Sequence, residues 1–212
     1  MFSDRSEAGR QLAALLQPRL GALRPLVLAL PRGGVLIGAE IARELDCDLD
    51  VLLVKKLRAP GSPELALGAV CEDGNVFVNR EVVNATDADE QYIESEIKER
   101  QAEIRLQAKL YRKVKAKVPV SGRVVILTDD GLATGATMIA SVETTALSRP
   151  DRLVVAVPVG APEALRTIQE LKTVDEVVWV LSPAWFEGVG QFYRDFRQIE
   201  DTEVIKLLEE FA

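Results

Sequence analysis

The stretch that most constrains the fold runs from Val124 to Thr137 and has the sequence VVILTDDGLATGAT. It begins with an unbroken apolar run rich in β-branched residues, continues with two adjacent acids, Asp129 and Asp130, and ends in a turn rich in glycine and threonine. Such a run is typical of a strand that is buried on both faces, as in a parallel sheet covered by helices. We therefore expect a buried parallel strand that ends at a polar turn, with a helix beginning at about Thr137.

The rest of the chain alternates apolar runs with helical patterns, which is the order of an α/β protein with a mainly parallel sheet flanked by helices. The predicted strands are 26–30, 50–54, 124–128, 152–157 and 176–181, with a hairpin at 65–70 and 76–78. The predicted helices are 3–17, 35–45, 137–147, 164–171 and 203–211. Ser3 is the expected N-cap of the first helix, and Pro18 is expected beyond its end.

Length and hydropathy indicate one globular domain. A chain of 212 residues is long enough for one sizeable core and short for two, so we expect a single domain over 1–212. Within it we expect a core at about 24–181, a long charged helix at 87–117 and a hood-like C-terminal segment at 182–212. No stretch approaches the ~18 apolar residues that are needed to span a bilayer, so no membrane partner is expected.

The charge balance excludes several kinds of site. The formal net charge is -7, whereas nucleic-acid binding requires clustered lysine and arginine, so no nucleic-acid partner is expected. The chain contains no histidine, which excludes the Ser-His-Asp and Cys-His nucleophile systems and imidazole metal sites. Its chemistry must then depend on carboxylates, lysine, arginine, backbone dipoles or a hard cation such as Mg²⁺.

The cysteines and the N-terminus together predict a cytoplasmic location. Cys47 and Cys71 both lie in apolar surroundings, so a disulfide framework is not expected. Residues 1–7 lack the basic start and apolar block of a secretory signal.

A second polar turn, Pro31-Arg32-Gly33-Gly34, follows the predicted strand 26–30. Two consecutive glycines between a strand and a helix allow backbone N–H groups to point at an anion, and Arg32 adds a fixed charge. A tight turn with a surface arginine is the alternative. Gly33, Gly34 and Gly38 do not give the G-x-G-x-x-G pattern of a dinucleotide site.

A basic cluster, Lys55, Lys56 and Arg58, follows the predicted strand 50–54 and precedes a segment rich in proline and glycine. We expect a charged, mobile loop here, with a solvated surface turn as the alternative. Ligands of parallel sheets bind at the carboxyl ends of the strands. Four loops are expected to converge there: 31–34, 55–58, 129–137 and 158–161.

The whole pattern of 124–137 resembles the phosphoribosyl pyrophosphate signature of type I phosphoribosyltransferases, in which a hydrophobic strand runs into two acids and a short loop ending in Thr-Gly-x-Thr. The resemblance extends from about Leu26 to Leu181 and implies the type I phosphoribosyltransferase fold. It also implies Mg²⁺-dependent displacement of pyrophosphate from C1 of 5-phosphoribosyl-1-pyrophosphate (PRPP) by a ring nitrogen of a nucleobase-like acceptor. A Walker B strand also ends in acids, but no G-x-x-x-x-G-K-[ST] sequence is present to accompany it.

The resemblance also assigns roles to residues. Asp129 and Asp130 would hold the ribose hydroxyls, with Asp130 keeping the sugar in its reactive geometry and Mg²⁺ held mainly by the substrate nearby. The loop around the 5-phosphate would comprise Gly131, Ala133, Thr134, Gly135, Ala136 and Thr137. The pyrophosphate would be bound by Arg32, Gly33 and Gly34, in a loop that often contains an unusual cis peptide in this family, and by Lys55 and Lys56 from a separate segment. Arg32 and Lys55 would be catalytic because they stabilise the leaving group.

The aromatic residues after the last predicted strand resemble the element that stacks on the acceptor base in nucleobase transferases, which makes Trp185 and Phe186 candidates for acceptor binding. Packing of the C-terminal segment is the alternative explanation. The long helix carries a narrow apolar stripe that includes Ile93, Ile104 and Tyr111. This stripe can pack against its own domain or against a second chain in a homodimer.

The acceptor stays open at this stage. Hypoxanthine-guanine enzymes carry an acid at the position that Ala133 fills here, whereas adenine and orotate enzymes carry alanine. Two alternatives to an enzyme remain: a regulatory protein that binds PRPP with little turnover, and a flavodoxin-like module that binds another phosphate at 134–137.

Overall fold

The structure, a computed structural model, describes residues 1–212 except for the side chains of Pro63 and Glu64. Its centre is a five-stranded parallel sheet with the strand order β2-β1-β6-β7-β8. The strands are β1 (Leu26–Ala29), β2 (Asp48–Val51), β6 (Val124–Thr128), β7 (Arg152–Val159) and β8 (Glu176–Leu181). The mainly parallel α/β architecture expected from the apolar runs is confirmed, with β6 at the centre of the sheet.

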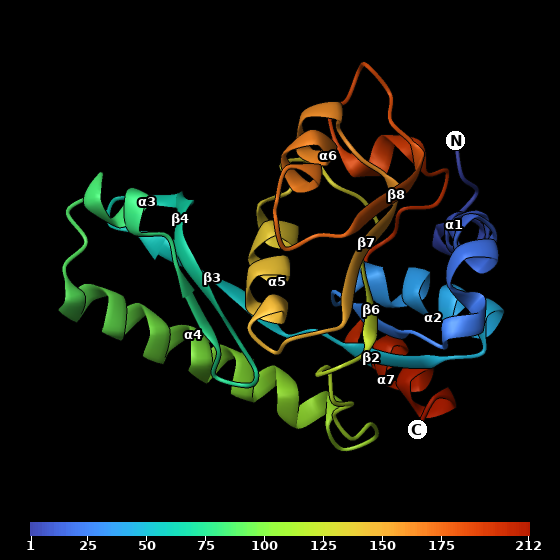
Figure 1. Ribbon diagram of the computed structural model, residues 1–212, viewed down its shortest axis with the longest axis horizontal. Coiled ribbons are helices and arrows are strands. Elements are labelled where there is room, and N and C mark those ends of the chain that lie inside the picture. Colours follow the sequence, from blue (N-terminus) through green and yellow to red (C-terminus); the bar gives the residue numbers. More distant parts are fainter.

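Helices cover both faces of this sheet (Figure 1). Alternate residues of each strand point to opposite faces, so Val27 and Ile126 join one apolar core while Leu28 and Leu127 join the other. The first core is completed by α1 (Arg5–Leu20), α2 (Gly33–Leu45) and α7 (Asp201–Glu210). The second core is completed by α5 (Ala136–Ala146) and α6 (Pro162–Gln169). Burial on both sides explains why these strands show no alternation of polar and apolar residues.

The start and end of the first helix differ from expectation. The N-cap of α1 is Asp4, whose carboxylate accepts a hydrogen bond from the backbone N–H of Glu7, so Ser3 is not the cap. Pro18 lies inside α1 near its end, not beyond it. Two 3₁₀ helices, η1 (Gly21–Leu23) and η2 (Val189–Phe192), add to the predicted elements.

A second, antiparallel sheet lies beside the first and carries the long helix (Figure 1). It consists of β3 (Val54–Ala59), β4 (Ser62–Cys71) and β5 (Val76–Val78), and it leads through α3 (Arg80–Asn84) into α4 (Glu90–Tyr111). The predicted hairpin is present as β4 and β5. The predicted mobile loop at 55–58 was wrong, because these residues form β3 and pair with β4. The lysines of this segment do not favour a strand, so the sequence did not predict one. The strand forms because β4 supplies its backbone hydrogen bonds.

The long helix packs within its own chain. Ile93, Ile104 and Tyr111 are buried in the core that also contains Leu57 of β3. Beyond the C-terminal end of α4, Arg112 donates to Asp50 Oδ1 at 2.6 Å and to Glu72 Oε2 at 2.7 Å. The chain around Arg112 therefore ties the parallel sheet to the turn after β4.

Candidate phosphoribosyl site

The strand order reverses between β1 and β6, because the chain moves outward to β2 in one direction and to β7 and β8 in the other. Ligands of open parallel sheets bind at such a reversal, outside the carboxyl ends of the two strands. The two turns that leave these strands are 31–34 after β1 and 129–137 after β6. Both were predicted to bind a ligand, the first because of its glycines and the second because of its two acids.

The two turns touch. A Cβ atom added to Gly33 would lie 2.0 Å from Asp130 Oδ2, and one added to Gly34 would lie 2.9 Å from the Cα atom of Asp129. Ordinary Cβ contacts begin at 3.4 Å, so any side chain at either glycine would displace the acids. The glycines are required here because backbone and carboxylates approach so closely. The peptide bond between Pro31 and Arg32 is cis, as the family resemblance implied.

The acid pair is electrostatically unusual. Burial raises the pKa of Asp129 well above its usual range, and the neighbouring charge of Asp130 raises it further. Burial also raises the pKa of Asp130, while a hydrogen bond from Arg5 Nε to Asp130 Oδ2 at 2.8 Å acts in the opposite direction. The backbone N–H of Asp130 donates to Asp129 Oδ1 at 2.8 Å. Hydroxyl donors or a cation brought to this pair would relieve the repulsion.

The loop after the acids is held from behind and open in front. Leu132 is buried, and its backbone donates to Val159 O at 2.9 Å and accepts from the N–H of Ala161 at 2.9 Å. The turn that follows β7 thus packs against this loop. Both were expected at the carboxyl edge of the parallel sheet. Exposed residues on the loop are Ala133, Thr134 and Thr137. Gly135, with φ +74, caps α5, which begins at Ala136, so the first-turn N–H groups of a helix face this open side.

Arg32 and Lys55 line one cavity of about 620 Å³ beside the Pro31–Gly34 turn. Each is near a carboxylate: Arg32 Nη1 lies 3.9 Å from Asp201 Oδ2, and Lys55 Nζ lies 3.6 Å from Glu103 Oε2. Lys56 is the next residue of β3, so its side chain leaves the opposite face of the strand. The structure therefore brings Arg32 and Lys55 together and sends Lys56 elsewhere.

The segment after β8 covers the acid end of β6. A Cβ atom on Gly131 would lie 2.6 Å from a methyl carbon of Val189 in η2, and Tyr193 Oη donates to the backbone carbonyl of Asp130 at 2.6 Å. Trp185 is 78% exposed, whereas Phe186 is partly buried with its ring centre 5.1 Å from that of Phe192. Of the two aromatic candidates, Trp185 offers the open face.

Sequence reasoning missed Arg5, Tyr193 and Val189, which contact the acids and their loop. The need of Arg5 for a fixed partner follows from its burial, 6% exposed, which only the structure shows. The sequence does not say that this partner is 125 residues away.

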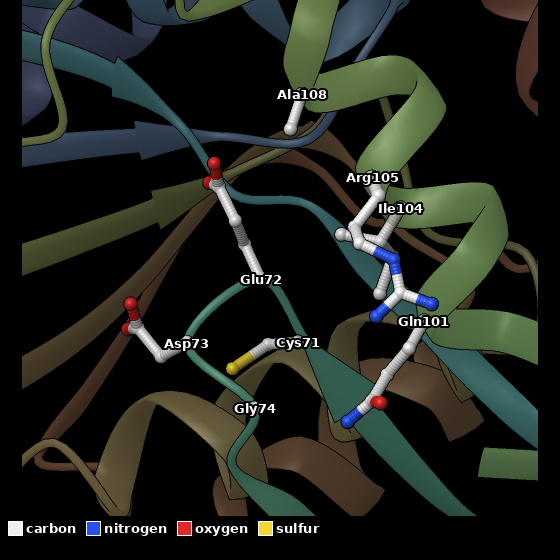
Figure 2. Close-up of a pocket in the computed structure, with 8 residues that line it drawn as sticks. All are labelled: Cys71, Glu72, Asp73, Gly74, Gln101, Ile104, Arg105 and Ala108. Carbon is white, nitrogen blue, oxygen red and sulfur yellow. The ribbon is translucent and has the colours of Figure 1, made fainter. Parts of the chain in front are cut away.

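Another cavity, of about 230 Å³, lies between the turn after β4 and α4 (Figure 2). Figure 2 shows Glu72 and Asp73 on one side and Gln101 and Arg105 on the other. None of the residues predicted to bind a ligand lines it. Across the part of the chain that the structure describes, no helix is long and apolar enough to cross a membrane.

Comparison with known proteins agrees with the geometry. The model of the phosphoribosyl transferase domain family matches residues 7–197. The crystal structure of TT1426 from Thermus thermophilus is 43% identical with a TM-score of 0.92, over 100% of this chain and 99% of that one. The structure of the AQ2163 protein from Aquifex aeolicus, 12% identical over 83% of this chain and 73% of that one, shares the fold with a TM-score of 0.50.

Among curated proteins, a Mycobacterium tuberculosis protein that carries a provisional name as a phosphoribosyl transferase is 40% identical over 209 residues. These residues are 99% of this chain and 46% of the relative, so the chain spans about half the length of the curated relatives it matches. The match of the family model over most of the chain, together with the shared fold, shows that the chain belongs to the phosphoribosyl transferase domain family.

Proposed function

We propose that this chain binds PRPP with Mg²⁺ and transfers the phosphoribosyl group to a nitrogenous acceptor, releasing pyrophosphate. The observation that carries the proposal is the contact between the acid pair and the diglycine turn at the reversal of the sheet. The two carboxylates can accept hydrogen bonds from a ribose diol, and the turn in contact with them can bind an anion. This pairing matches PRPP, whose pyrophosphate is attached to the ribose carbon next to those that carry the hydroxyls.

Magnesium is expected to be held mainly by the ligand. Among the described residues, no group of three or more His, Cys, Asp or Glu side chains is placed to hold a metal ion. The residues present nevertheless fit a metal–PRPP complex, because the partly buried Asp129–Asp130 pair, with raised pKa values, gains from a cation close to it. When bound, Mg²⁺ would supply charge neutralisation for the departing pyrophosphate.

The proposal assigns each part of PRPP to a group of residues. Asp129 and Asp130 would accept hydrogen bonds from the ribose hydroxyls and fix the sugar ring. The loop from Gly131 to Thr137 would receive the 5-phosphate, with the first-turn N–H groups of α5 as donors.

The pyrophosphate would lie against the Pro31–Gly34 turn, within reach of Arg32 and Lys55. Negative charge grows on pyrophosphate as the bond to C1 breaks, so these cations bind the transition state more strongly than the ground state. Glu103 and Asp201, which now lie near them, would give way to the ligand.

The acceptor is expected on the side of the hood. Trp185, with its open face, is the better candidate for stacking on a planar acceptor such as a nucleobase. Ala133 is exposed in the phosphate loop and supplies no acid to a purine, which favours acceptors other than 6-oxopurines.

Release of pyrophosphate tests the proposal. PRPP and Mg²⁺ would be incubated with a panel of nucleobases and other planar nitrogen acceptors, and pyrophosphate would be measured by a coupled assay. We expect release with at least one acceptor, and none from the variant that combines Asp129→Asn with Asp130→Asn. PRPP binding without release across the panel would instead support a regulatory PRPP-binding protein. Release that persists in the double variant would refute the site.

A further inference from the structure

Arg5, the first residue of α1, is buried and held by three groups. Its Nε donates to Asp130 Oδ2 at 2.8 Å, and its Nη1 donates to the backbone carbonyl of Arg197 at 3.0 Å. Its Cζ lies 3.9 Å from the centre of the Phe196 ring, a distance at which a guanidinium gains a cation–π contact. Such a set of partners is needed because a buried charge without them is strongly unfavourable.

These partners join parts of the site that are far apart in sequence. A Cβ atom on Gly33 would lie 3.0 Å from Arg5 Nε, so Arg5 also contacts the turn expected to bind pyrophosphate. Arg197 and Phe196 belong to the hood, and Tyr193 from the same segment donates to the backbone carbonyl of Asp130. Asp130 is therefore held through its side chain by α1 and through its backbone by the hood.

We propose that Arg5 is a positioning residue of the phosphoribosyl site: it fixes the direction of the Asp130 carboxylate and places a positive charge beside the acid pair, leaving Asp130 Oδ1 to accept a ribose hydroxyl. The proposal deepens the proposed function and depends on it for the role of Asp130. It differs from that function in assigning a part of the site to the N-terminal helix. It also explains why Asp130 is paired with a buried arginine and not left to solvent.

The charged and titratable groups around Asp130 are few. Asp129 adjoins Asp130 at the same strand end, and the charge of Asp130 raises the pKa of Asp129. Tyr193 faces the backbone of Asp130, and Arg5 provides a positive charge from α1. Burial raises the pKa of the Tyr193 hydroxyl, so this group stays neutral. The positive charge of Arg5 acts to lower the pKa of both acids, because it favours the ionised carboxylate.

A titration without ligand tests this directly. The ¹³Cγ signals of labelled aspartates would be followed against pH in the wild type, Arg5→Gln and Arg5→Lys, with the pair assigned from Asp129→Asn and Asp130→Asn. Arg10→Gln is the matched control, because Arg10 lies on the same helix, is 60% exposed at its side chain and has its carboxylate neighbour Glu40 at 3.8 Å.

We expect the midpoint of the acid pair to rise by about one unit or more in Arg5→Gln, to stay near the wild-type value in Arg5→Lys and to be unchanged in Arg10→Gln. An unchanged midpoint in folded Arg5→Gln would overturn the proposal. A rise in Arg5→Lys as large as that in Arg5→Gln would also overturn it, because the charge would then not be the cause. If Arg5→Gln does not fold, Phe196→Leu removes the ring beneath the guanidinium from a position that is 37% exposed. A rise in the midpoint of the acid pair in Phe196→Leu supports the proposal, and an unchanged midpoint contradicts it.

Ligand binding separates this proposal from the proposed function. With PRPP and Mg²⁺, the affinity lost by Arg5→Gln should be greatest at low pH, up to about tenfold for each unit of pKa change, and should recover as pH rises. An equal loss at every pH would indicate a merely structural role and count against the proposal. If the wild type binds no PRPP, the proposed function fails, while the ligand-free titration still decides whether Arg5 controls the acid pair.

Discussion

Replacing Gly33 with alanine tests the contact between the two turns. The new methyl group would lie 2.0 Å from Asp130 Oδ2 and 2.8 Å from Asp130 Cγ, so the carboxylate has to move by more than an ångström to reach ordinary contact. The movement breaks the 2.8 Å hydrogen bond from Arg5 Nε and turns Asp130 away from the place expected for the ribose.

Two magnitudes follow. A hydrogen bond to a charged group contributes about 1.5–3 kcal/mol, so losing the bond from a ribose hydroxyl to Asp130 should weaken PRPP binding about tenfold to a hundredfold. Crowding in a packed site costs about 1–3 kcal/mol of folding free energy, which lowers the melting temperature by roughly 2–12 °C in a chain of this size. Binding and folding should therefore each lose a comparable free energy, so both have to be measured.

The assay is calorimetric titration of PRPP with Mg²⁺ into wild type and Gly33→Ala, with differential scanning calorimetry of both. Gly188→Ala is the matched control, because its backbone is extended and an added Cβ meets nothing within 4 Å. We expect wild-type affinity for the control. Folded Gly33→Ala that binds PRPP as tightly as the wild type would refute the reasoning, since the acids could then move without consequence.

Three further predictions concern other parts of the site. Burial and the charge of Asp130 raise the pKa of Asp129 above its value in the unfolded chain, so the folded state loses stability as pH rises past about 4. Ligand-free Asp129→Asn should therefore melt at a higher temperature than the wild type at neutral pH. The difference should vanish in acid, where the wild-type carboxyl is protonated in both states. Lys55→Ala should weaken pyrophosphate binding several-fold, and less at high salt because the side chain is 39% exposed. Lys56→Ala, on the opposite face of β3, should change pyrophosphate binding little, and an equal effect of both substitutions would contradict the assignment. Trp185→Ala should raise the acceptor KM while PRPP affinity and melting temperature stay near wild type, and a loss of PRPP affinity would show that Trp185 has another role.

The parts of the fold that local patterns specify could be predicted. The apolar runs gave the parallel strands, because a strand buried on both faces needs apolar residues throughout. Asp129, Asp130 and the glycines of both turns could be identified because acids and glycines next to a buried strand have few structural reasons to be there. The cis peptide came only from the family resemblance.

The parts that depend on distant neighbours could not be predicted. The lysines of β3 carry no strand signal, and the strand forms because β4 lies beside it. Arg5 and Tyr193 reach Asp130 from residues 125 and 63 positions away, and nothing in their local sequence names that partner. Sequence spacing also could not separate Lys55 from Lys56, since the choice depends on which face of β3 meets the cavity.

The most direct test of the central claim is a calorimetric titration of PRPP, with and without Mg²⁺, into the wild type and into the Asp129→Asn, Asp130→Asn double variant. A second double variant, Glu90→Gln with Glu94→Gln on the exposed side of α4, matches the change in charge at a distance from the site. The account predicts Mg²⁺-dependent binding in the wild type and in this control, and none in the aspartate variant. Binding that needs no Mg²⁺, or that survives loss of both aspartates, would contradict it.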